Sequence, residues 1–409
     1  MRRALDGVVV LDLTTALAGP YATMLLAGLG ARVIKVENRS TGGDAARNNS
    51  PYLTGDGLSL RRTCENDMSL SHLSRSRNKE SLTLDLKSSR GHEIFLDLVG
   101  KADVVVENFS AGVTGRLGIS YEDLEPANPR LIYTSISGFG ADGGDGRAMD
   151  TIIQALSGIM LTAGDPDGQP IRCGLPIADL AAPLFAVIGT LGAIAHRTRT
   201  GEGQQVDVSM LGALTSLVAA EHYEASVKLG MPTRTGQFVP RLAPFGTFEC
   251  HDGWIAVCAP LDKFAHGVLA AIGSPELVRD QRFAYRDARV ENADVLHKLI
   301  AEWARTQATA EAVATLDSHG VPVAPVRDPV QAMRDERVRA RGEVMPLSGT
   351  DDPDGEKLLG PGLPFVLSKS ATSLEQRAPY LGEHSRTILA ELLGYTEQHL
   401  DILEQDAVL

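Results

Sequence analysis

Short runs of β-branched residues alternate with helical patterns in the first third of the chain. Strands are expected at residues 8–13, 32–37, 102–106 and 131–135, and helices at 20–29 and 90–99. Alternation of strands and helices predicts a parallel sheet with helices on its faces. Ligands of such sheets bind beyond the carboxyl ends of the strands. The residues of interest are therefore 14–19, 38–39, 107–109 and 137–140.

The later part of the chain predicts further elements and a second, smaller unit. Residues 40–76 are polar and irregular, which indicates a functional or disordered loop, and strands are expected at 81–86 and 204–208. The apolar stretch 180–195 is interrupted by Pro183, so we expect a buried helix and no membrane span. A hairpin across Asp252 and Gly253, helices between 263 and 318, and a return at 320–326 indicate the smaller unit.

Composition and charge narrow the possible functions. A net charge of -13 makes the chain a poor general binder of nucleic acid or anionic membranes, although it leaves room for a local basic cleft. The four cysteines lack C-x-x-C spacing, which favours reduced thiols over disulfides or a zinc site. The beginning of the sequence lacks the apolar core of a signal peptide. We therefore expect a cytoplasmic protein with no nucleic-acid or membrane partner.

One glycine-rich segment matches a nucleotide-binding motif. Residues 138–143 read G-x-G-x-x-G after a strand, but the dinucleotide fingerprint belongs to the first strand–helix turn of a sheet. We expect a flexible turn, with dinucleotide binding as the alternative. The ten histidines show no H-x-x-x-H spacing, and no G-x-S-x-G elbow occurs. Neither a metal site nor a serine hydrolase is therefore expected.

Asp179 is a candidate nucleophile that also has a structural interpretation. It stands just before the apolar helix, where aspartate is a common N-cap. The same position would keep the carboxylate ionised beside the positive end of the helix dipole. An ionised carboxylate can attack an activated acyl group. The residues alone leave both roles open.

Several cations lie near the expected strand ends of this acidic chain. They are Arg75, Arg77, Lys79, Arg116 and Arg147. Each alone is typical of a solvated surface charge. Together they favour a polyphosphate ligand, because cations bind phosphate through charge-assisted hydrogen bonds.

Seven short stretches occur in a specific order. They are LDGVVVLDL (5–13), AGP (18–20), LGARVIKVE (29–37), NK (78–79), LDLK (84–87), ADVVVENF (102–109) and YLGEH (380–384). In this order they resemble the class III CoA-transferase family, which includes formyl-CoA transferase and α-methylacyl-CoA racemase. The resemblance covers nearly the whole chain.

The resemblance implies an α/β fold and an interlocked homodimer, with a related second subunit as the alternative. The fold would have a large Rossmann-like domain, its parallel sheet formed from both chain ends, and a smaller inserted α+β domain. The expected bounds are 1–200 for the large CoA-binding domain, 201–228 for a linker helix, 229–326 for the small domain and 327–409 for the return segment.

The resemblance also implies roles for individual residues. Asp179 would be the catalytic aspartate, and CoA or acyl-CoA would be a substrate, with no tightly bound cofactor and no metal. The expected CoA site comprises Leu17, Arg39, Arg77, Lys79, Asn108, Phe109, Arg116, Arg147 and Asp150. Leu17 replaces the glutamine of formyl-CoA transferases, which argues against formyl or oxalate substrates. Asn38 stands where some relatives have an arginine that contacts the adenine of CoA. Arg39 or Arg77 would make that contact here.

Transfer and racemisation differ in the bases that they need. Racemases of this family have a histidine beside the residue matching Asp150, and here that neighbour is Met149, which cannot accept a proton at neutral pH. We therefore predict CoA transfer between carboxylic acids through an aspartyl-CoA thioester. The alternatives are an acyl-CoA racemase or epimerase, a nucleotide-dependent oxidoreductase and a non-catalytic CoA-binding protein.

The expected substrates are succinyl-CoA and a small dicarboxylic acid. The free carboxylate of a diacid needs a cation, and an arginine fork binds both of its oxygens. Arg172, Arg234 and Arg241 are available near the expected active-site loops. The alternative is that these arginines face solvent or join subunits.

Overall fold

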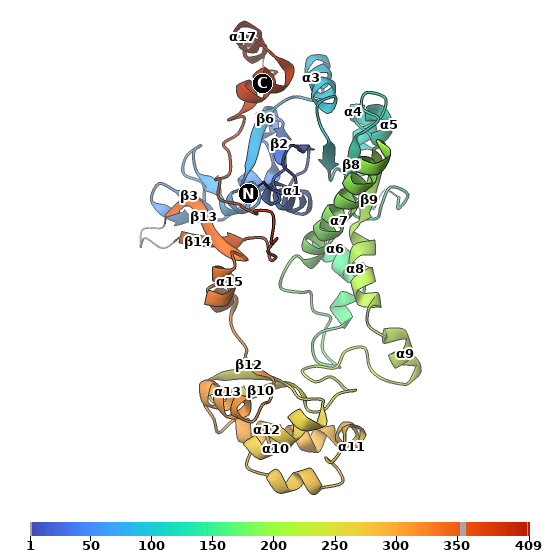
Figure 1. The fold of residues 1–409 in the computed structure, drawn as a ribbon, viewed down its shortest axis with the longest axis vertical. Helices are drawn as coiled ribbons and strands as arrows, with labels where there is room; N and C mark the ends of the chain where they lie inside the picture. Colours follow the sequence, from blue (N-terminus) through green and yellow to red (C-terminus); the bar gives the residue numbers. More distant parts are fainter. Residues whose placement is uncertain (1, 145, 352–356, 407) are drawn as a thin grey trace. The chain divides into compact units, whose positions relative to one another are not determined.

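Six parallel strands form the central sheet of the structure, a computed structural model that describes residues 2–144, 146–351, 357–406 and 408–409. They are β1 (Val9–Asp12), β2 (Arg32–Glu37), β6 (Lys79–Thr83), β7 (Val104–Glu107), β8 (Ile132–Ser137) and β9 (Gln204–Ser209). Their order is β6-β2-β1-β7-β8-β9, and β6, β2, β8 and β9 are labelled in Figure 1. The expected α/β fold is confirmed. The order reverses between β1 and β7, where doubly wound sheets bind their ligands.

The chain divides into two compact units. Unit 1 comprises Met1–Ser157, Cys173–Val218 and Met333–Leu409, and unit 2 comprises Gly158–Arg172 and Ala219–Ala332. Residues 158–172, expected in the large domain, therefore group with unit 2. The expected linker 201–228 begins with β9, which is an edge strand of the sheet and so part of unit 1.

Helices cover both faces of the sheet, because alternate strand residues point to opposite sides. The helices that begin in unit 1 are α1 (Ala18–Gly28), α2 (Leu70–Arg75), α3 (Ser89–Val99), α4 (Val113–Leu117), α5 (Tyr121–Leu124), α6 (Asp150–Leu156), α7 (Ile177–Thr200), α8 (Met210–Ala219), α15 (Glu336–Ala340), α16 (Ser385–Leu393) and α17 (Glu397–Gln405). Leu11, Ile34 and Val105 share one buried cluster with α3, α16 and α17. On the other face, α1 packs on β2 and α7 packs on β8 and β9.

The C-terminal segment completes unit 1 without adding a strand to the parallel sheet. All six strands come from residues 9–209, so the expectation that both chain ends form the sheet is wrong in this detail. The segment instead supplies α16, α17 and the antiparallel hairpin of β13 (Val344–Asp351) and β14 (Lys357–Pro361). It is tied to β6, because Gly382 donates to Ser81 Oγ at 2.9 Å and Thr83 donates to Ser385 Oγ at 3.1 Å.

Residues 40–76 are more regular than their composition suggests. Besides α2 and short 3₁₀ turns, they contain β3 (Tyr52–Thr54), β4 (Gly57–Ser59) and β5 (Met68–Ser69). These strands form a small antiparallel sheet of order β4-β3-β5. Strands of two or three residues are too short to show an alternating pattern, so the sequence did not predict them.

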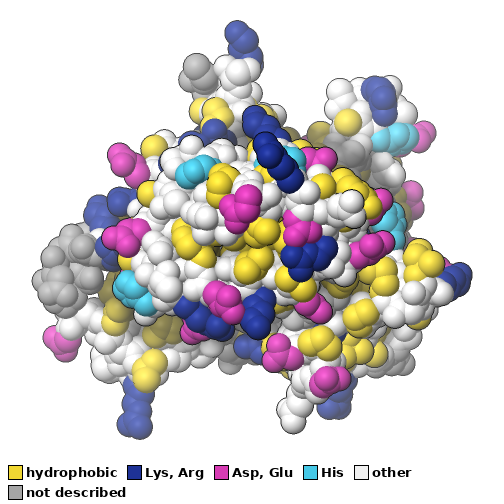
Figure 2. Space-filling model, turned by 90° about the horizontal axis from the view of Figure 1, so that it is seen from below, with side chains coloured by type: hydrophobic (Ala, Val, Ile, Leu, Met, Phe, Trp, Pro, Cys, Tyr) yellow, Lys and Arg dark blue, Asp and Glu magenta, His cyan; other side chains and the backbone are white. Residues whose placement is uncertain are grey.

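Unit 2 contains a three-stranded antiparallel sheet covered by helices. The predicted hairpin is confirmed as β10 (Phe245–Cys250) and β11 (Gly253–Cys258), and β12 (Val323–Pro325) pairs with β11. The remaining helices of the chain are α9 (Tyr223–Lys228), α10 (Asp262–Ala271), α11 (Arg286–Glu291), α12 (Ala293–Ala304), α13 (Thr309–Ser318) and α14 (Pro329–Met333). Phe248, Ile255 and Leu296 belong to its buried core. On the face shown in Figure 2, the acidic and basic side chains of the described residues are interspersed.

Helix α7 is longer and less buried than expected. By length and composition alone it could cross a membrane, and only 44% of its most apolar window is buried. The expectation of no membrane span relied on Pro183, which lies inside the helix without ending it, although buried core helices reach the same length and hydropathy. One face packs on α1 and the sheet, whereas Leu184, Phe185 and Ile188 are exposed. Such an apolar stripe is typical of protein–protein interfaces. The dimer stays a prediction.

Candidate active site

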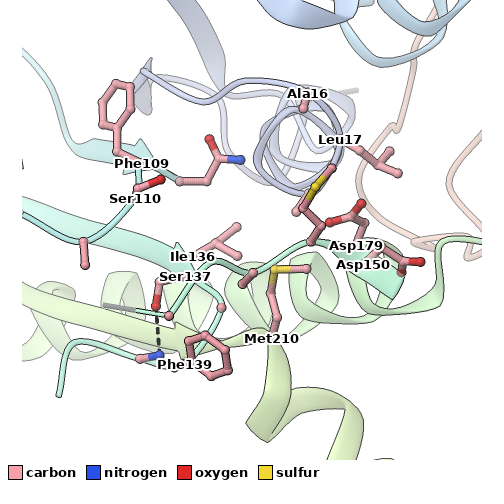
Figure 3. Close-up of a pocket in the computed structure, with 18 of the residues that line it drawn as sticks. Ala16, Leu17, Phe109, Ser110, Ile136, Ser137, Phe139, Asp150, Asp179 and Met210 are labelled. Atoms are coloured by element: carbon pink, nitrogen blue, oxygen red, sulfur yellow. Dashed lines mark hydrogen bonds between the residues drawn. The ribbon is translucent and has the colours of Figure 1, made fainter. Parts of the chain in front are cut away.

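The carboxyl ends of β1, β7 and β8 meet at a cavity of about 360 Å³ within unit 1. It lies at the reversal of strand order, where a ligand is expected. The lining includes Leu17, Asn108, Phe109, Asp150, Asp179 and Met210 (Figure 3). Five of these six residues were predicted from the sequence as site residues, and Met210 was not. The structure thus brings five predicted site residues together in one cavity. The G-x-G-x-x-G segment forms a turn in the same wall, and no helix begins within it, unlike a dinucleotide fingerprint.

Asp179 lies in the first turn of α7, and Asp150 opens α6. Asp179 is not the N-cap, because Pro176 occupies that position. Asp150 performs the capping instead: its Oδ1 accepts from the Ala178 amide at 2.9 Å, and its Oδ2 accepts from Gln154 Nε2 at 2.8 Å. Asp150 is therefore held in place, whereas within the described residues no hydrogen bond or ion pair holds the Asp179 carboxylate.

The surroundings of Asp179 suit a nucleophile. Burial raises the pKa of its carboxyl, the charge of Asp150 raises it further, and Arg75 opposes the rise, with a result of about 6. The group is therefore mostly ionised at neutral pH. Because it is partly desolvated and accepts no hydrogen bond within the described chain, little has to be removed from the carboxylate before it attacks.

Asn108 fixes the loop that follows β1. Its side-chain oxygen accepts from the Thr15 amide at 2.8 Å, and its side-chain nitrogen donates to the Thr15 carbonyl at 2.9 Å. This pairing joins the loops after β1 and β7, which are neighbouring strands on the two sides of the reversal. Asn108 thus shapes the cavity as well as lining it.

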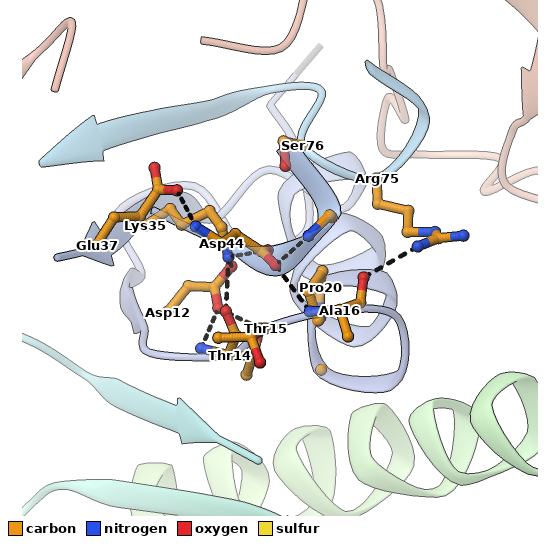
Figure 4. A network of polar contacts seen from close by, with 12 residues as sticks. Asp12, Thr14, Thr15, Ala16, Pro20, Lys35, Glu37, Asp44, Arg75 and Ser76 are labelled. Carbon is orange, nitrogen blue, oxygen red and sulfur yellow. Dashed lines mark hydrogen bonds and ion pairs between the residues drawn. The ribbon is translucent and has the colours of Figure 1, made fainter. Parts of the chain in front are cut away.

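A buried cluster of charges lies behind the loop after β1 (Figure 4). Lys35 Nζ is 2.8 Å from Asp44 Oδ2, Lys79 Nζ is 2.9 Å from Asp12 Oδ2, and all four side chains are fully buried. Lys79 also donates to Thr23 Oγ1 at 2.7 Å. Burial would raise the pKa of Asp12, but Lys35 and Lys79, together with hydrogen bonds from Thr14 and Thr23, outweigh it and hold that pKa well below its usual range. The cluster ties β1, β2 and β6 together.

Comparison with known proteins assigns the chain to a family. A family model described as CoA-transferase family III matches residues 5–385. The chain belongs to CoA-transferase family III. This confirms the resemblance seen in the sequence and identifies the protein as a CoA-transferase.

Relatives of this CoA-transferase cover almost the whole chain. A succinyl-CoA:mesaconate CoA-transferase of Haloarcula hispanica is 39% identical over 399 residues, covering 95% of this chain and 96% of that protein. An acetyl-CoA:oxalate CoA-transferase of Acetobacter aceti is 38% identical over 363 residues, covering 85% and 90%. The crystal structure of a CAIB/BAIF family protein from Brucella suis has a TM-score of 0.83 at 32% identity, covering 96% of this chain and 100% of that one.

Two of the cations expected to bind CoA are instead used inside the fold. Lys79 is fully buried, and its ammonium is taken up by Asp12, Thr23 and a main-chain carbonyl. Arg77 is also buried, and it donates to the Ser74 carbonyl at 3.1 Å and to the Pro361 carbonyl. The structure contradicts CoA contacts for both residues. From the sequence alone, a charged residue next to a strand is taken to be solvated, because its partner on a distant segment cannot be recognised.

The other expected CoA cations are exposed. Arg39 donates to Thr83 Oγ1 at 3.5 Å, and neither Arg116 nor Arg147 lines the cavity. Arg147 nevertheless lies between the lining residues Gly146 and Ala148. These positions are compatible with a ligand that extends out of the cavity.

A second cavity of about 250 Å³ lies beyond the carboxyl ends of β2 and β6. It shares Thr15 and Phe109 with the first cavity. Its lining also includes Asn38 and Lys87, and it includes Val113 and Leu117 on either side of Arg116. Phe109 therefore stands at the junction of two cavities that an extended thioester could occupy in sequence.

The three arginines expected to bind a diacid belong to unit 2. Arg234 is buried, and its Nη1 donates to the carbonyls of Asp165 at 3.2 Å, Gln169 at 3.0 Å and Gly168. This bonding is internal, and it contradicts the expected role of Arg234 as a substrate cation. Arg241 forms an exposed ion pair with Glu221 at 3.0 Å. Arg172 is exposed and takes part in an interaction of its own.

Sequence reasoning missed Arg75 and Asp44, whose side chains bind the backbone of the cavity-lining residue Ala16. Arg75 was one of several cations without a distinct role, and Asp44 lay in a segment interpreted as irregular. A usable signal was Lys35, a lysine within the apolar strand RVIKVE. A lysine inside a buried strand requires a carboxylate partner. The sequence could not show that two carboxylates, Asp12 and Asp44, fill this role.

Proposed function

We propose that this CoA-transferase moves CoA from succinyl-CoA to a small dicarboxylic acid, with Asp179 as the nucleophile. The observation that carries the proposal is the Asp179 carboxylate, which is ionised at neutral pH, partly desolvated and open to a cavity at the reversal of strand order. Both relatives described above name a dicarboxylic acid, mesaconate or oxalate, and the more similar one names succinyl-CoA. Met149 lines the same cavity beside Asp150, which supports transfer over racemisation because a thioether is no base.

The proposed reaction proceeds through two anhydrides and one enzyme thioester. An Asp179 oxygen attacks the thioester carbon of succinyl-CoA, the C–S bond breaks, and CoA leaves as a thiolate with the electron pair. The thiolate then attacks the Asp179 carbonyl carbon of the mixed anhydride and expels succinate. An aspartyl-CoA thioester remains on the enzyme.

The second half of the reaction repeats these steps with the acceptor. The acceptor carboxylate attacks the aspartyl-CoA thioester, releases the thiolate and forms a second anhydride. Attack of the thiolate on the acceptor carbonyl gives the new acyl-CoA and regenerates the Asp179 carboxylate. Each intermediate keeps an activated acyl group, so the transfer needs no ATP.

The substrate proposal predicts a preference for diacids. Succinyl-CoA should be a better donor than acetyl-CoA, and C4–C5 diacids should be better acceptors than monoacids of equal length, by at least about tenfold in kcat/KM. Steady-state kinetics with mass detection of the new thioesters measures both preferences. Oxalate belongs in the acceptor panel, because one relative is named for it. Equal or better use of monoacids would remove the substrate assignment but leave the transferase assignment intact.

We also propose that Arg116 and Arg147 contact the phosphates of CoA outside the two cavities. Charge-assisted hydrogen bonds are each worth about 1.5–3 kcal/mol. Arg116→Ala and Arg147→Ala should therefore each raise the KM for CoA thioesters by at least about tenfold, with kcat little changed. Arg130→Ala is a matched control. Arg130 lies just before β8, at the amino ends of the strands and away from the cavities, and it donates to the Gly201 carbonyl. An unchanged KM in both test variants would contradict the assignment.

A further inference from the structure

Ala16 adopts an unusual backbone conformation in the wall of the active-site cavity. Its φ angle is +66°, in the left-handed region that a residue with a Cβ atom adopts only at a cost in free energy. Ala16 and Leu17 both line the cavity that contains Asp179. Some part of the surrounding structure must therefore hold Ala16 in this conformation.

Two charged side chains bind the backbone of Ala16 (Figure 4). Asp44 Oδ1 accepts a hydrogen bond from the Ala16 amide at 2.7 Å, and Arg75 Nη1 donates one to the Ala16 carbonyl at 2.9 Å. Asp44 is itself fixed, because its Oδ2 is 2.8 Å from Lys35 Nζ and its Oδ1 also accepts from the Ala46 amide at 2.8 Å. The buried charge cluster thus extends to the cavity wall.

The same contacts hold the guanidinium of Arg75 near the nucleophile. Burial lowers the pKa of Arg75, and the charges of Asp44 and Asp179 oppose this effect. In return, Arg75 opposes the rise in the pKa of Asp179 that burial and Asp150 cause. The charge of Arg75 therefore acts on Asp44 and on Asp179 at once.

We propose that Asp44 and Arg75 are positioning residues for CoA transfer: together they hold Ala16 in the left-handed conformation and place a positive charge where it favours the ionised nucleophile. Asp44 acts through Ala16 and Arg75. Arg75 acts through Ala16 and on Asp179. The inference rests on the proposed role of Asp179. It predicts a loss in kcat for both variants. The change in KM should be small for Arg75, which lines neither cavity, whereas Asp44 lines the second cavity and is therefore judged by kcat alone.

The first test is the pH dependence of kcat/KM. Arg75→Ala should move the acidic limb to higher pH by at least about half a unit and lower activity at pH 6 by about twofold or more. Arg75→Lys keeps the positive charge and one donor, so it should restore the limb to within about 0.2 of the wild-type value. Arg61→Ala, at an exposed arginine of the same chain region, should leave the profile unchanged. A wild-type limb in folded Arg75→Ala would overturn the electrostatic part of the proposal.

The second test is rescue by glycine. Glycine adopts positive φ without a Cβ penalty. If Asp44 acts by holding Ala16, Asp44→Ala should lower kcat by at least about tenfold, and Ala16→Gly in the same chain should recover at least about threefold. Failure of glycine to rescue a folded Asp44→Ala variant would overturn this part. Should Asp44→Ala not fold, Arg75→Ala with and without Ala16→Gly gives the same comparison.

Asp179→Asn distinguishes the proposed role of Asp179 as nucleophile from the proposed positioning roles of Asp44 and Arg75. Full activity of that variant would remove the nucleophile and with it this inference. An inactive Asp179→Asn together with wild-type kcat and pH profile in both Arg75→Ala and Asp44→Ala would overturn the inference alone.

Discussion

Asp179→Asn is expected to abolish CoA transfer and at the same time to stabilise the folded protein at neutral pH. The amide cannot form the anhydride and thioester intermediates, so the turnover number should fall by at least about 10⁴-fold. The amide also removes a partly buried charge that is repelled by Asp150. Activity measurements and thermal unfolding of the same preparations give both results.

The stability gain should depend on pH in a defined direction. The folded-state pKa of Asp179 is raised to about 6 from an ordinary value of 3.8, so the native state favours the protonated carboxyl. The wild-type protein therefore loses stability as the pH rises from about 4 to about 6, whereas asparagine is neutral throughout. After allowance for residual exposure the difference above pH 6 should be no more than about 2 kcal/mol, and it should vanish below about pH 4.

Two observations would complete this test of Asp179. Hydroxylamine or borohydride added during turnover should modify Asp179 in the wild-type protein, because these reagents trap activated carboxyl groups. Asp97→Asn is a matched control at an exposed aspartate of α3 that lines neither cavity, and it should keep wild-type activity. Near-wild-type turnover of Asp179→Asn would rule out the covalent mechanism.

Asp12→Asn is expected to produce a large loss of folding stability. It would leave the buried ammonium of Lys79 without its carboxylate partner, and breaking a buried ion pair costs about 3–5 kcal/mol. Lys79→Met should also destabilise, and the pair Asp12→Asn with Lys79→Met should lose less than the sum of the single changes. Urea unfolding measures the three free energies.

The same variants decide between two roles for Lys79. In the structure Lys79 stabilises the sheet, so folded Lys79→Met should keep the wild-type KM for CoA thioesters. Lys87→Met is a useful comparison, since Lys87 lines the second cavity. A tenfold rise in KM for Lys79→Met without loss of stability would restore the CoA role that the sequence suggested.

The sequence predicted the elements whose side-chain pattern is long enough to read. The β-branched run at 32–37 is β2 with the same bounds, and the helix pattern at 90–99 is α3 within one residue. The predicted nucleophile and its neighbours Leu17, Asn108, Phe109 and Asp150 do share one cavity. They do so because the carboxyl ends of parallel strands lie on the same side of the sheet. A sequence pattern of alternating strands and helices is sufficient to predict this.

The errors have a common physical cause. The roles of Arg77, Lys79 and Arg234 depend on carbonyls and carboxylates that are distant in the sequence or lie in irregular segments. A charged residue has no periodic signature, so its sequence neighbours cannot show whether it is solvated or paired. The small sheet of residues 52–69 was missed for a related reason, because strands of two or three residues have no measurable period.

The attachment of the C-terminal segment determines the order in which the two units can be completed during synthesis. A nascent chain that ends at residue 332 already contains every residue of unit 2. It still lacks Gly382 and Ser385, the partners of Ser81 and Thr83 about three hundred residues earlier. Contacts this distant in sequence close slowly, and domains otherwise tend to fold from the N-terminus as they leave the ribosome. In this protein unit 2, from the middle of the chain, can therefore fold first. The N-terminal strands of unit 1 are synthesised early, but they gain their C-terminal contacts only after the end of the chain has been translated.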